Sequence, residues 1–401
     1  MPPHNGLVHP KEYDIKDSNV ELIGTDIDHK VKYNSAATEP AWNNGEIGAC
    51  AGLFIWRVEN FAVVPIAREA YGQFFEGDSY IVLHTEEVES QQGDNKLIHD
   101  IFFWLGAHTS QDEAGTAAYK TVELDEFLHG TATQHRELQV NPSEEFLALF
   151  PRLTVRRGGV ASGFRHVEDV GSPEVATLLR VFKRSNGAGG RDTVVVHEVD
   201  PTWRSLDEQD VFILDKGDKI WVWQGKDCSP MEKAKAAQVV HDMTIAKHVD
   251  VEVVSQAEPR AYRVVRELGG DEDRGVEALH AARPLRSAEV VEGGESRRRQ
   301  LFRLSDASGQ LVFELVAEDA FVSASSLDTN DVFLLDDGEK QIWVWEGKKA
   351  SVAERAMWLK VAQDYIRQLQ AGEKHEPHLL PITYVREGRE SVAFRKVIQA
   401  A

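Results

Sequence analysis

The chain has 401 residues, of which 42% are apolar, and its 45 lysines and arginines against 66 aspartates and glutamates give a formal net charge of −21. This length predicts two to four domains, and the composition is typical of a soluble globular protein. The negative charge argues against general nucleic-acid binding, which needs a positive field, and suits a protein that gathers divalent cations.

The sequence carries few targeting or redox features. Its only cysteines, Cys50 and Cys228, lie far apart, so no disulfide framework is expected and a reducing compartment is the default. The chain does not open on a basic segment followed by an apolar run, so we predict no signal peptide. No stretch approaches the roughly 18 uninterrupted apolar residues of a membrane-spanning helix. These features predict a cytoplasmic protein.

The first third of the chain predicts an extension, a group of strands and two helices. Residues 1–45 are polar, with few apolar anchors, and are expected to form an N-terminal extension partly packed on the first domain. Strands are predicted where β-branched and aromatic residues gather, at 53–57, 80–84 and 101–105. A long helix is predicted over residues 110–130, and a shorter one over 144–150.

The predicted long helix has clear local signals at both ends. Ser110 is a plausible N-cap, Glu113 completes a capping box, and Gly130 is a natural stop. A core-facing stripe recurs at helical spacing: Ala117, Thr121, Leu124 and Leu128. Tyr119 and Val122 lie on another face, which indicates a partner surface. The alternative is that Tyr119 is a half-buried boundary residue.

Three segments of the chain repeat one pattern. An aspartate enters a strand, an aromatic strand then ends in glycine, and a glutamate opens a helix seven residues after that glycine. The members are Asp78, Gly106 and Glu113; Asp210, Gly225 and Glu232; Asp331, Gly347 and Glu354. The aspartates lie 132 and 121 residues apart, which is too long for a solenoid repeat. Strands followed by a helix in each copy predict three copies of a small α+β domain.

We therefore divide the chain into five parts. The extension, 1–45, precedes repeat 1 at 46–170 and repeat 2 at 171–268. A linker rich in glycine and charge occupies 269–299, and repeat 3 occupies 300–401.

The repeated aspartate and glutamate predict a cation site in each repeat. Two carboxylates on rigid elements, with backbone carbonyls nearby, suit a hard cation with six to eight oxygen ligands. Calcium fits better than zinc, because the sequence has no Cys/His cluster, and magnesium is a weaker candidate. The alternative is that these acids only cap helices and end strands.

Several segments of repeat 1 resemble the gelsolin family: GLFIWRVENFAVVP, FFEGDSYIVLHT, FFWLG and SQDEAGTAAYKTVELDEFLHG. The three copies together, over about residues 46–400, resemble its short three-repeat members of the severin and fragmin type. The resemblance implies a mixed sheet between a long and a short α-helix in every repeat. It also implies calcium-regulated severing of actin filaments and capping of their barbed ends.

The resemblance assigns calcium ligands in each repeat. In repeat 1 it implies the carbonyls of Gly77 and Val160 and the carboxylates of Asp78 and Glu113. In the other repeats it implies Gln209, Asp210 and Glu232, and Asn330, Asp331 and Glu354. The third carboxylate of the repeat 2 site could come from Asp271 or Asp273, and the sequence does not decide between them.

A further calcium site shared with actin is implied on Asp125 and the carbonyls of Gly130 and Ala132. Its missing ligand would be an actin carboxylate. The family's long helix inserts into a cleft of actin, which would give a partner to Asp112, Tyr119, Val122 and Asp125. In the inactive state we expect the repeats to mask this helix.

Two basic stretches flank the junction of repeats 1 and 2. The resemblance implies that they bind phosphoinositides such as phosphatidylinositol 4,5-bisphosphate, through Arg152, Arg156, Arg157, Arg180, Lys183 and Arg184. The alternative is a solvated charged face.

No catalytic function is predicted, because the G-x-S-x-G, H-E-x-x-H and P-loop patterns are all missing from the sequence. Two functions remain: a monomeric, calcium-switched severing and capping protein of the cytoskeleton, or a calcium-dependent capper or scaffold that does not sever.

Overall fold

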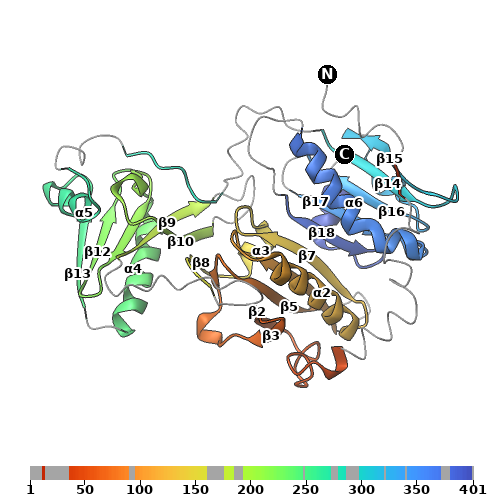
Figure 1. Ribbon diagram of the computed structural model, residues 1–401, viewed down its shortest axis with the longest axis horizontal. Coiled ribbons are helices and arrows are strands. Elements are labelled where there is room, and N and C mark those ends of the chain that lie inside the picture. The colour runs from red at the N-terminus through yellow and green to blue at the C-terminus, as the bar shows by residue number, and fades with distance from the viewer. Residues whose placement is uncertain are drawn as a thin grey trace.

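The computed structural model describes residues 11–13, 36–89, 95–159, 176–184, 193–246, 249–271, 279–285, 298–319, 322–338, 341–371 and 380–399. Within these residues the strands form two sheets (Figure 1). The larger has 11 strands in the order β1-β15-β14-β16-β17-β18-β7-β6-β5-β2-β3, and the smaller has seven in the order β13-β12-β11-β9-β10-β8-β4.

Repeat 1 places different helices on the two faces of its sheet. Its elements are β2 (Gly52–Glu59), β3 (Ala62–Pro65), β4 (Gln73–Phe75), β5 (Ser79–Glu89), β6 (Asn95–Leu105), α2 (Gln111–Phe127), β7 (Ala132–Leu138), α3 (Glu144–Ala148) and β8 (Leu153–Arg156). In β5, Ile81 packs in one cluster with Leu124 of α2. The adjacent Val82 packs on the other face with Phe146 of α3. Alternate side chains of the strand therefore reach opposite helices.

Repeat 2 is built in the same way around the smaller sheet. Its elements are β9 (Thr177–Arg184), β10 (Thr193–Val199), β11 (Val211–Asp215), β12 (Lys219–Gln224), α4 (Pro230–Ala246), β13 (Asp250–Ser255) and α5 (Tyr262–Glu267). In β12, Val222 packs with Val239 of the long helix α4. The next residue, Trp223, packs with Val264 of the short helix α5.

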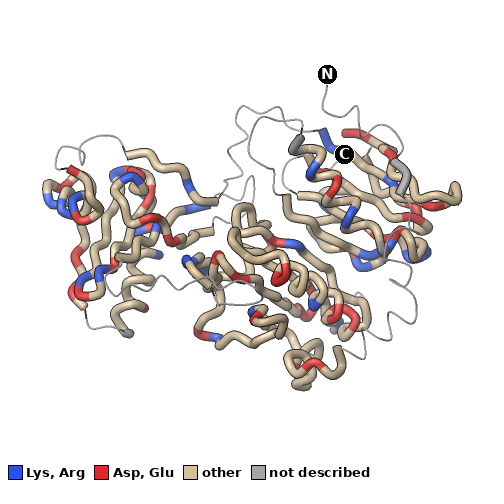
Figure 2. Tube along the Cα trace, viewed as in Figure 1, with Lys and Arg blue, Asp and Glu red and all other residues tan. Residues whose placement is uncertain are grey.

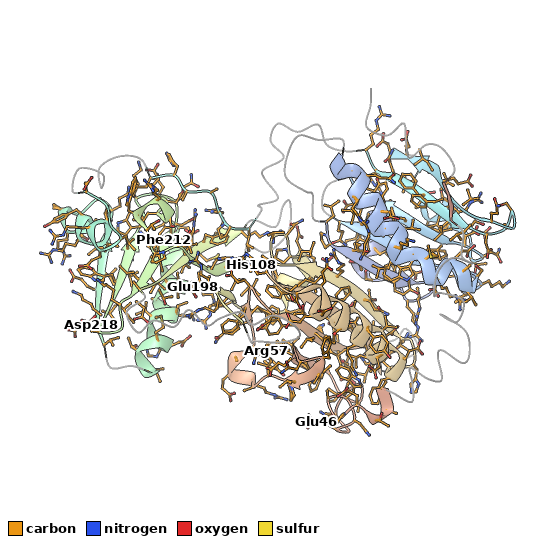
Figure 3. The ribbon with its side chains drawn as sticks, in the orientation of Figure 1. Glu46, Arg57, His108, Glu198, Phe212 and Asp218 are labelled. Carbon is orange, nitrogen blue, oxygen red and sulfur yellow. The ribbon has the colours of Figure 1, made fainter. Side chains whose placement is uncertain are left out.

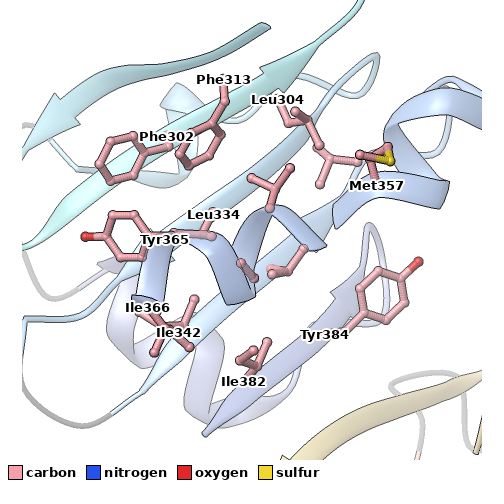
Figure 4. Close-up of a cluster of buried hydrophobic side chains, with 14 of the residues drawn as sticks. Phe302, Leu304, Phe313, Leu334, Ile342, Met357, Tyr365, Ile366, Ile382 and Tyr384 are labelled. Carbon is pink, nitrogen blue, oxygen red and sulfur yellow. The ribbon is translucent and has the colours of Figure 1, made fainter. Parts of the chain in front are cut away.

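Repeat 3 repeats the arrangement a third time. Its elements are β14 (Gln300–Ser305), β15 (Leu311–Glu318), β16 (Val332–Asp336), β17 (Ile342–Glu346), α6 (Val352–Ala371), β18 (Ile382–Arg386) and α7 (Val392–Gln399). Leu334 packs with Tyr365 of α6 in the cluster drawn in Figure 4. Leu335 packs on the opposite face with Phe394 of α7. A sheet between a long and a short helix, predicted for each repeat, is confirmed.

Sheets continue across the repeat boundaries, which the sequence did not predict. Strand β18 of repeat 3 pairs antiparallel with β7 of repeat 1, with Thr383 opposite His135. Their side chains also meet, since Thr383 Oγ1 lies 3.2 Å from His135 Nδ1. On the other side, β8 of repeat 1 pairs in parallel with β10 of repeat 2. Repeat 1 is therefore joined to both of its neighbours through strand edges.

The N-terminal extension contacts two repeats. Trp42 is fully buried in the repeat 1 core and meets Trp56 edge to face, with ring centroids 5.2 Å apart. Glu39 forms an ion pair with Lys120 of α2 at 2.7 Å. These contacts confirm the expected packing on the first domain. Strand β1 (Lys11–Tyr13), which was not predicted, pairs with β15 at the far edge of repeat 3.

Helix α2 matches its prediction closely. The Ser110 hydroxyl accepts from the Glu113 amide at 3.2 Å, as a capping box requires. Gly130 has a φ of +64°, a left-handed conformation that suits glycine at a helix stop. The predicted core stripe is buried throughout: Ala117, Thr121, Leu124 and Leu128. The short helix predicted at 144–150 is α3.

Candidate functional site

The turn that carries the repeated aspartate has one backbone geometry in all three repeats. The aspartate carbonyl accepts from the amide of the strand-ending glycine at 3.0 Å in repeats 1 and 2 and 3.1 Å in repeat 3. A Cβ atom on that glycine would lie 2.3 Å from a backbone carbonyl oxygen in every copy, so only glycine fits. The aspartates are buried: Asp78 is 0% exposed, Asp210 0% and Asp331 7%. The sequence repeat is therefore a repeat of one buried carboxylate turn.

The repeated glutamate lies in the first turn of the long helix of each repeat and forms a capping box with the serine three residues earlier. The glutamate amide donates to the serine hydroxyl at 3.2 to 3.3 Å, and the carboxylates of Glu232 and Glu354 accept from the serine amide at 2.7 and 2.9 Å. The pairs are Ser110 with Glu113, Ser229 with Glu232, and Ser351 with Glu354. Each glutamate is more than nine-tenths buried. Capping is thus a real structural role of these acids, and it does not exclude a second role as cation ligands.

One arginine per repeat lies beside the aspartate turn, and sequence reasoning missed it. Arg57, Arg180 and Arg303 each stand opposite the residue two positions after the repeated aspartate. The guanidinium lies 3.7 Å from the aspartate in repeat 1 and 2.6 Å in repeat 2, whereas in repeat 3 it pairs with Glu314. Aligning the strand segments LFIWR, TLLR and QLFR on their arginine would have found this position.

In repeat 1, hydroxyl groups connect the two candidate carboxylates. Ser79, the residue after Asp78, has its Oγ 2.7 Å from Thr109 Oγ1, and Thr109 donates to Glu113 Oε2 at 3.0 Å. Burial raises the pKa of Glu113, because the hydrogen bonds from Thr109 and Ser110 offset the lost hydration only in part. A carboxylate in this state gains from a nearby positive charge, so the donor set fits a cation.

A glycine loop covers the same aspartate turn. The Gly77 amide donates to the Gly158 carbonyl at 2.9 Å, and a Cβ on Gly159 would lie 2.5 Å from Asp78 Oδ1. Backbone can come this close to the carboxylate only because Gly159 has no side chain. The next residue, Val160, lies outside the described residues. The structure therefore brings the expected neighbours of Val160 to Asp78 without describing Val160 itself.

In repeat 3 the acidic residues Asp306, Asp331 and Glu354 lie near one another. Burial, together with the nearby carboxylates of Asp306 and Asp331, raises the pKa of Glu354 to about 7. The Asp306 amide donates to Glu354 Oε1 at 2.8 Å, so this third acid, missed by sequence reasoning, lies at the site. The backbone and side-chain amides of Asn330 both donate to Asp328 Oδ1, at 2.9 and 2.7 Å. Asp331 and Glu354 are the two repeat 3 carboxylates that could hold a cation.

Repeat 2 differs, because its aspartate is already held by two arginines. Arg180 Nε and Arg283 Nη2 donate to opposite oxygens of Asp210, each at 2.6 Å. Gln209 is exposed, and Glu232 accepts from two backbone amides at 2.6 and 2.7 Å. The expected calcium ligands Gln209, Asp210 and Glu232 do not form a set that fits a divalent cation in this conformation, since two positive charges already neutralise the carboxylate.

The site expected to be shared with actin holds an arginine from repeat 3. Asp125 accepts from the Ala132 amide and from Gln134 Nε2, both at 2.9 Å. Arg386 lies 3.3 Å from Asp125 Oδ2 and donates to the Gly130 carbonyl at 2.6 Å. Burial raises the pKa of Asp125, although Arg386 opposes this. The structure therefore brings all three predicted residues together, with a guanidinium where a cation was expected.

The outer face of α2 remains open. Tyr119 is 50% exposed in the middle of the helix, Val122 is partly buried and Asp112 is exposed. The masking expected of the inactive state does not extend to Tyr119 in this structure. Repeat 3 reaches only the C-terminal end, at Asp125 and Gly130.

The predicted phosphoinositide residues divide into two groups. Acidic and basic residues are interspersed over both sheets (Figure 2). Glu198, on the side of the smaller sheet next to repeat 1 (Figure 3), pairs with Arg156 at 2.7 Å. Arg152 and Arg157 are likewise partly exposed and ion-paired. Arg180 and Arg184 are only 1% and 6% exposed, so neither can reach a lipid head group in this arrangement.

Some predicted features remain without a structural description. Of the two candidate third ligands in repeat 2, Asp271 is exposed and Asp273 lies outside the described residues. Across the described ranges no group of three or more His, Cys, Asp or Glu side chains has a metal-binding arrangement. Cys50 and Cys228 are free thiols. Among the helices that the structure describes, none has the length and apolarity needed to cross a membrane.

Comparison with known proteins supports the repeat architecture. The gelsolin repeat model matches residues 60–147, 192–270 and 316–395. Gelsolin-like protein 1 of Lumbricus terrestris is 37% identical over 398 residues, covering 98% of this chain and 99% of that protein. Severin of Echinococcus granulosus is 34% identical, covering 90% and 92%. Gelsolin of Gallus gallus is 36% identical, covering 82% of this chain and 40% of that protein. The chain belongs to the gelsolin family.

Proposed function

We propose that this protein severs actin filaments and caps their barbed ends under the control of calcium. One observation carries the proposal: helix α2 exposes Tyr119 in its middle while its C-terminal end is held by Arg386 of repeat 3. Tyrosine is enriched at protein interfaces, because its ring gives apolar contact while its hydroxyl can hydrogen-bond. Family membership and the likeness to severin and gelsolin point to actin as the partner.

In this proposal α2 acts as the wedge that enters actin. Tyr119 and Val122 supply apolar contact, and Asp112 supplies a polar one at the first turn of the helix. Asp125 and the carbonyls of Gly130 and Ala132 would complete a cation site together with an actin carboxylate. A wedge seated at a filament end blocks addition of the next subunit, which is capping.

Repeats 1 and 3 carry the calcium response in this proposal. The residues that would hold the ions are Asp78 with Glu113, and Asp331 with Glu354. A bound calcium ion would add positive charge between these buried carboxylates. Arg386 must leave Asp125 and Gly130 before that end of α2 can meet actin, and its departure parts β18 from β7. The closed form would therefore be the inactive one.

Three partly exposed arginines support inhibition by phosphoinositides. The side chains of Arg152, Arg156 and Arg157 are 25%, 37% and 41% exposed, and each pairs with a carboxylate of repeat 2. A phosphorylated head group would compete for these guanidinium groups by bidentate contact. Binding would loosen the junction between repeats 1 and 2. We place the protein, as a monomer, in the cytoplasm with the actin cytoskeleton.

The test follows fluorescent actin filaments in flow, with free calcium at micromolar level or removed by chelator. Fragmentation along the filament that occurs only with calcium supports severing. Blocked elongation at barbed ends without fragmentation supports the alternative, a capper that does not sever. Identical filaments in both buffers overturn the proposal.

A further inference from the structure

We infer that arginine side chains of the protein itself supply the positive charge at the repeat 2 site, in place of a calcium ion. Arg283, together with Arg180, takes the place beside Asp210 that the family pattern assigns to calcium, and holds segment 279–285 on repeat 2 without a metal. The inference rests on the proposed function, because it divides the calcium sites among the repeats. Repeats 1 and 3 bind the ion, whereas the contacts of Asp210 in repeat 2 stay the same with or without calcium.

Asp210 is the centre of a buried charge cluster. It is 0% exposed, and Arg180 is only 1% exposed. Arg180 Nε donates to Oδ2 and Arg283 Nη2 to Oδ1, both at 2.6 Å, so both carboxylate oxygens are engaged. Guanidinium groups stay charged at all ordinary pH values. The carboxylate therefore has its positive partners whether or not calcium is present.

The same arginines fasten the segment that leads from repeat 2 towards repeat 3. Arg180 donates to the carbonyls of Ala281 and Ala282 at 3.0 and 2.9 Å. Apolar anchors flank these contacts, since Leu279 and Leu285 are 5% and 2% exposed in separate clusters of repeat 2. The segment is thus seated by side-chain packing and by main-chain bonds to a buried arginine.

Arg283, which belongs to segment 279–285, also binds the segment to repeat 2. It donates to the Lys183 carbonyl at 3.0 Å and lies over the Phe182 ring, 5.5 Å from its centroid. Its bond to Asp210 bridges 73 positions of the chain. Removing this one side chain should therefore loosen the segment from the repeat 2 sheet.

Comparison of the three repeats shows what is special in repeat 2. Arg57 stays 3.7 Å from its aspartate and also binds Glu59, while Arg303 turns to Glu314. Asp210, in contrast, is bound closely by two arginines. An ion at the usual calcium–oxygen distance of about 2.4 Å from Asp210 would share that carboxylate with two positive charges. Expelling Arg180 instead would leave a buried charge unpaired, which is strongly unfavourable.

The first experiment compares thermal unfolding of the full chain with and without Arg283→Met, in chelator and in saturating calcium. We expect the variant to lower the unfolding midpoint by the same amount in both buffers, because the arginine stays in place when calcium is added. A drop that occurs in chelator and vanishes in calcium would mean that the ion replaces the arginine, and would overturn the inference. Arg303→Met, at the strand position of repeat 3 that corresponds to Arg180, is the control and should shift the midpoint much less, because Arg303 pairs with Glu314.

The second experiment counts bound calcium by titration calorimetry. Asp78→Asn should lower the stoichiometry by one, whereas Asp210→Asn should leave it unchanged. Loss of one ion in Asp210→Asn would refute the inference while leaving the proposed function intact. If the unsubstituted chain binds no calcium, the proposed calcium control fails, and the unfolding comparison alone still tests Arg283. Should Asp210→Asn not fold, Glu232→Gln gives the same count.

Discussion

The contact of Arg386 with repeat 1 predicts how firmly the closed form is held. Arg386 is the side chain of β18 that reaches Asp125 and the Gly130 carbonyl, at 3.3 and 2.6 Å. We predict that Arg386→Ala raises the fraction of molecules in which the junction between β7 and β18 is open in the absence of calcium. The closed form of the variant keeps the backbone pairing of the two strands, so the change removes the side-chain contribution alone.

The size of the effect follows from the interactions that this substitution removes. A hydrogen bond to a charged group contributes about 1.5–3 kcal/mol, and the Arg386 side chain is 26% exposed, so partial screening favours about 2 kcal/mol. This corresponds to about a 30-fold rise in the ratio of open to closed chains. A closed state favoured about 100-fold would then hold roughly a quarter of its molecules open.

Amide hydrogen exchange in chelator measures this ratio directly. Those strand amides of 134–136 and 382–384 that bond across the junction should exchange about 30-fold faster in Arg386→Ala, because they exchange through its opening, whereas the alternate amides face β6 or β17. Arg355→Ala is the matched control. Like Arg386, which lies 3.8 Å from Glu346, Arg355 lies beside Glu346, at 3.5 Å. Arg355 also donates to the Lys348 carbonyl, and both of its partners belong to repeat 3. Equal exchange rates in Arg386→Ala and the unsubstituted chain would refute the reasoning, as would an equal effect of the control.

Three further predictions test the wedge, the repeated turn and a buried histidine. Replacing Tyr119 and Val122 together by Asp should abolish binding of monomeric actin and leave calcium binding unchanged; unaltered actin affinity removes α2 from the interface. Gly106→Ala should destabilise by about 3 kcal/mol or more in denaturant unfolding, because its Cβ would meet backbone carbonyls, whereas Gly115→Ala, in open space on α2, should stabilise by about 0.5–1 kcal/mol. Burial lowers the pKa of His197 to about 4 in the folded chain. As pH falls, His197 is therefore protonated first in the unfolded chain, and the free energy of unfolding decreases between about pH 6.5 and pH 4. His197→Asn should flatten that part of the stability profile, and an unchanged profile contradicts the assignment.

The long helix could be predicted from sequence because its determinants are local. The Ser110 cap, the buried stripe and the left-handed Gly130 all lie within 21 consecutive residues, and the structure begins α2 at Gln111 and ends it at Phe127. The repeated turn was also predictable, because aspartate, glycine and glutamate keep one order in each copy. Short-range chemistry was sufficient for both features.

The joining of repeats through strand edges could not be predicted in the same way. The strand segment ITYVR of β18 encodes a strand but not the neighbour that completes its edge. Its partner β7 lies in another repeat, and the bond from Arg386 to Gly130 bridges 256 positions. Edge pairing depends on how whole domains meet, and pattern reasoning on one strand contains no information about that arrangement.

The basic stretches show that an anion site is also hard to predict from sequence alone. Arg152 to Arg157 and Arg180 to Arg184 are close in sequence and suggested one patch. In an acidic chain, however, most guanidinium groups find a carboxylate of the same molecule, and Arg180 is drawn fully into the core by Asp210. A run of arginines therefore predicts a free anion site only where the fold leaves it without internal partners, and at Arg152, Arg156 and Arg157 a phosphorylated head group would have to displace a carboxylate.

Because the chain has a large negative net charge, these arginine contacts have a strong effect on the balance between the open and closed forms. At −21, separating the repeats reduces the self-repulsion of the chain, so the overall field favours opening. The closed form must then depend on specific contacts, of which Arg386 on Asp125 crosses between repeats and Arg283 on Asp210 fastens the linker. Since one such contact is worth about 2 kcal/mol, a modest gain of positive charge at Glu113 and Glu354 could shift the balance. A strongly acidic chain closed by a few arginines is therefore suited to respond to a divalent cation, and the repeat whose carboxylate is already neutralised serves as its fixed support.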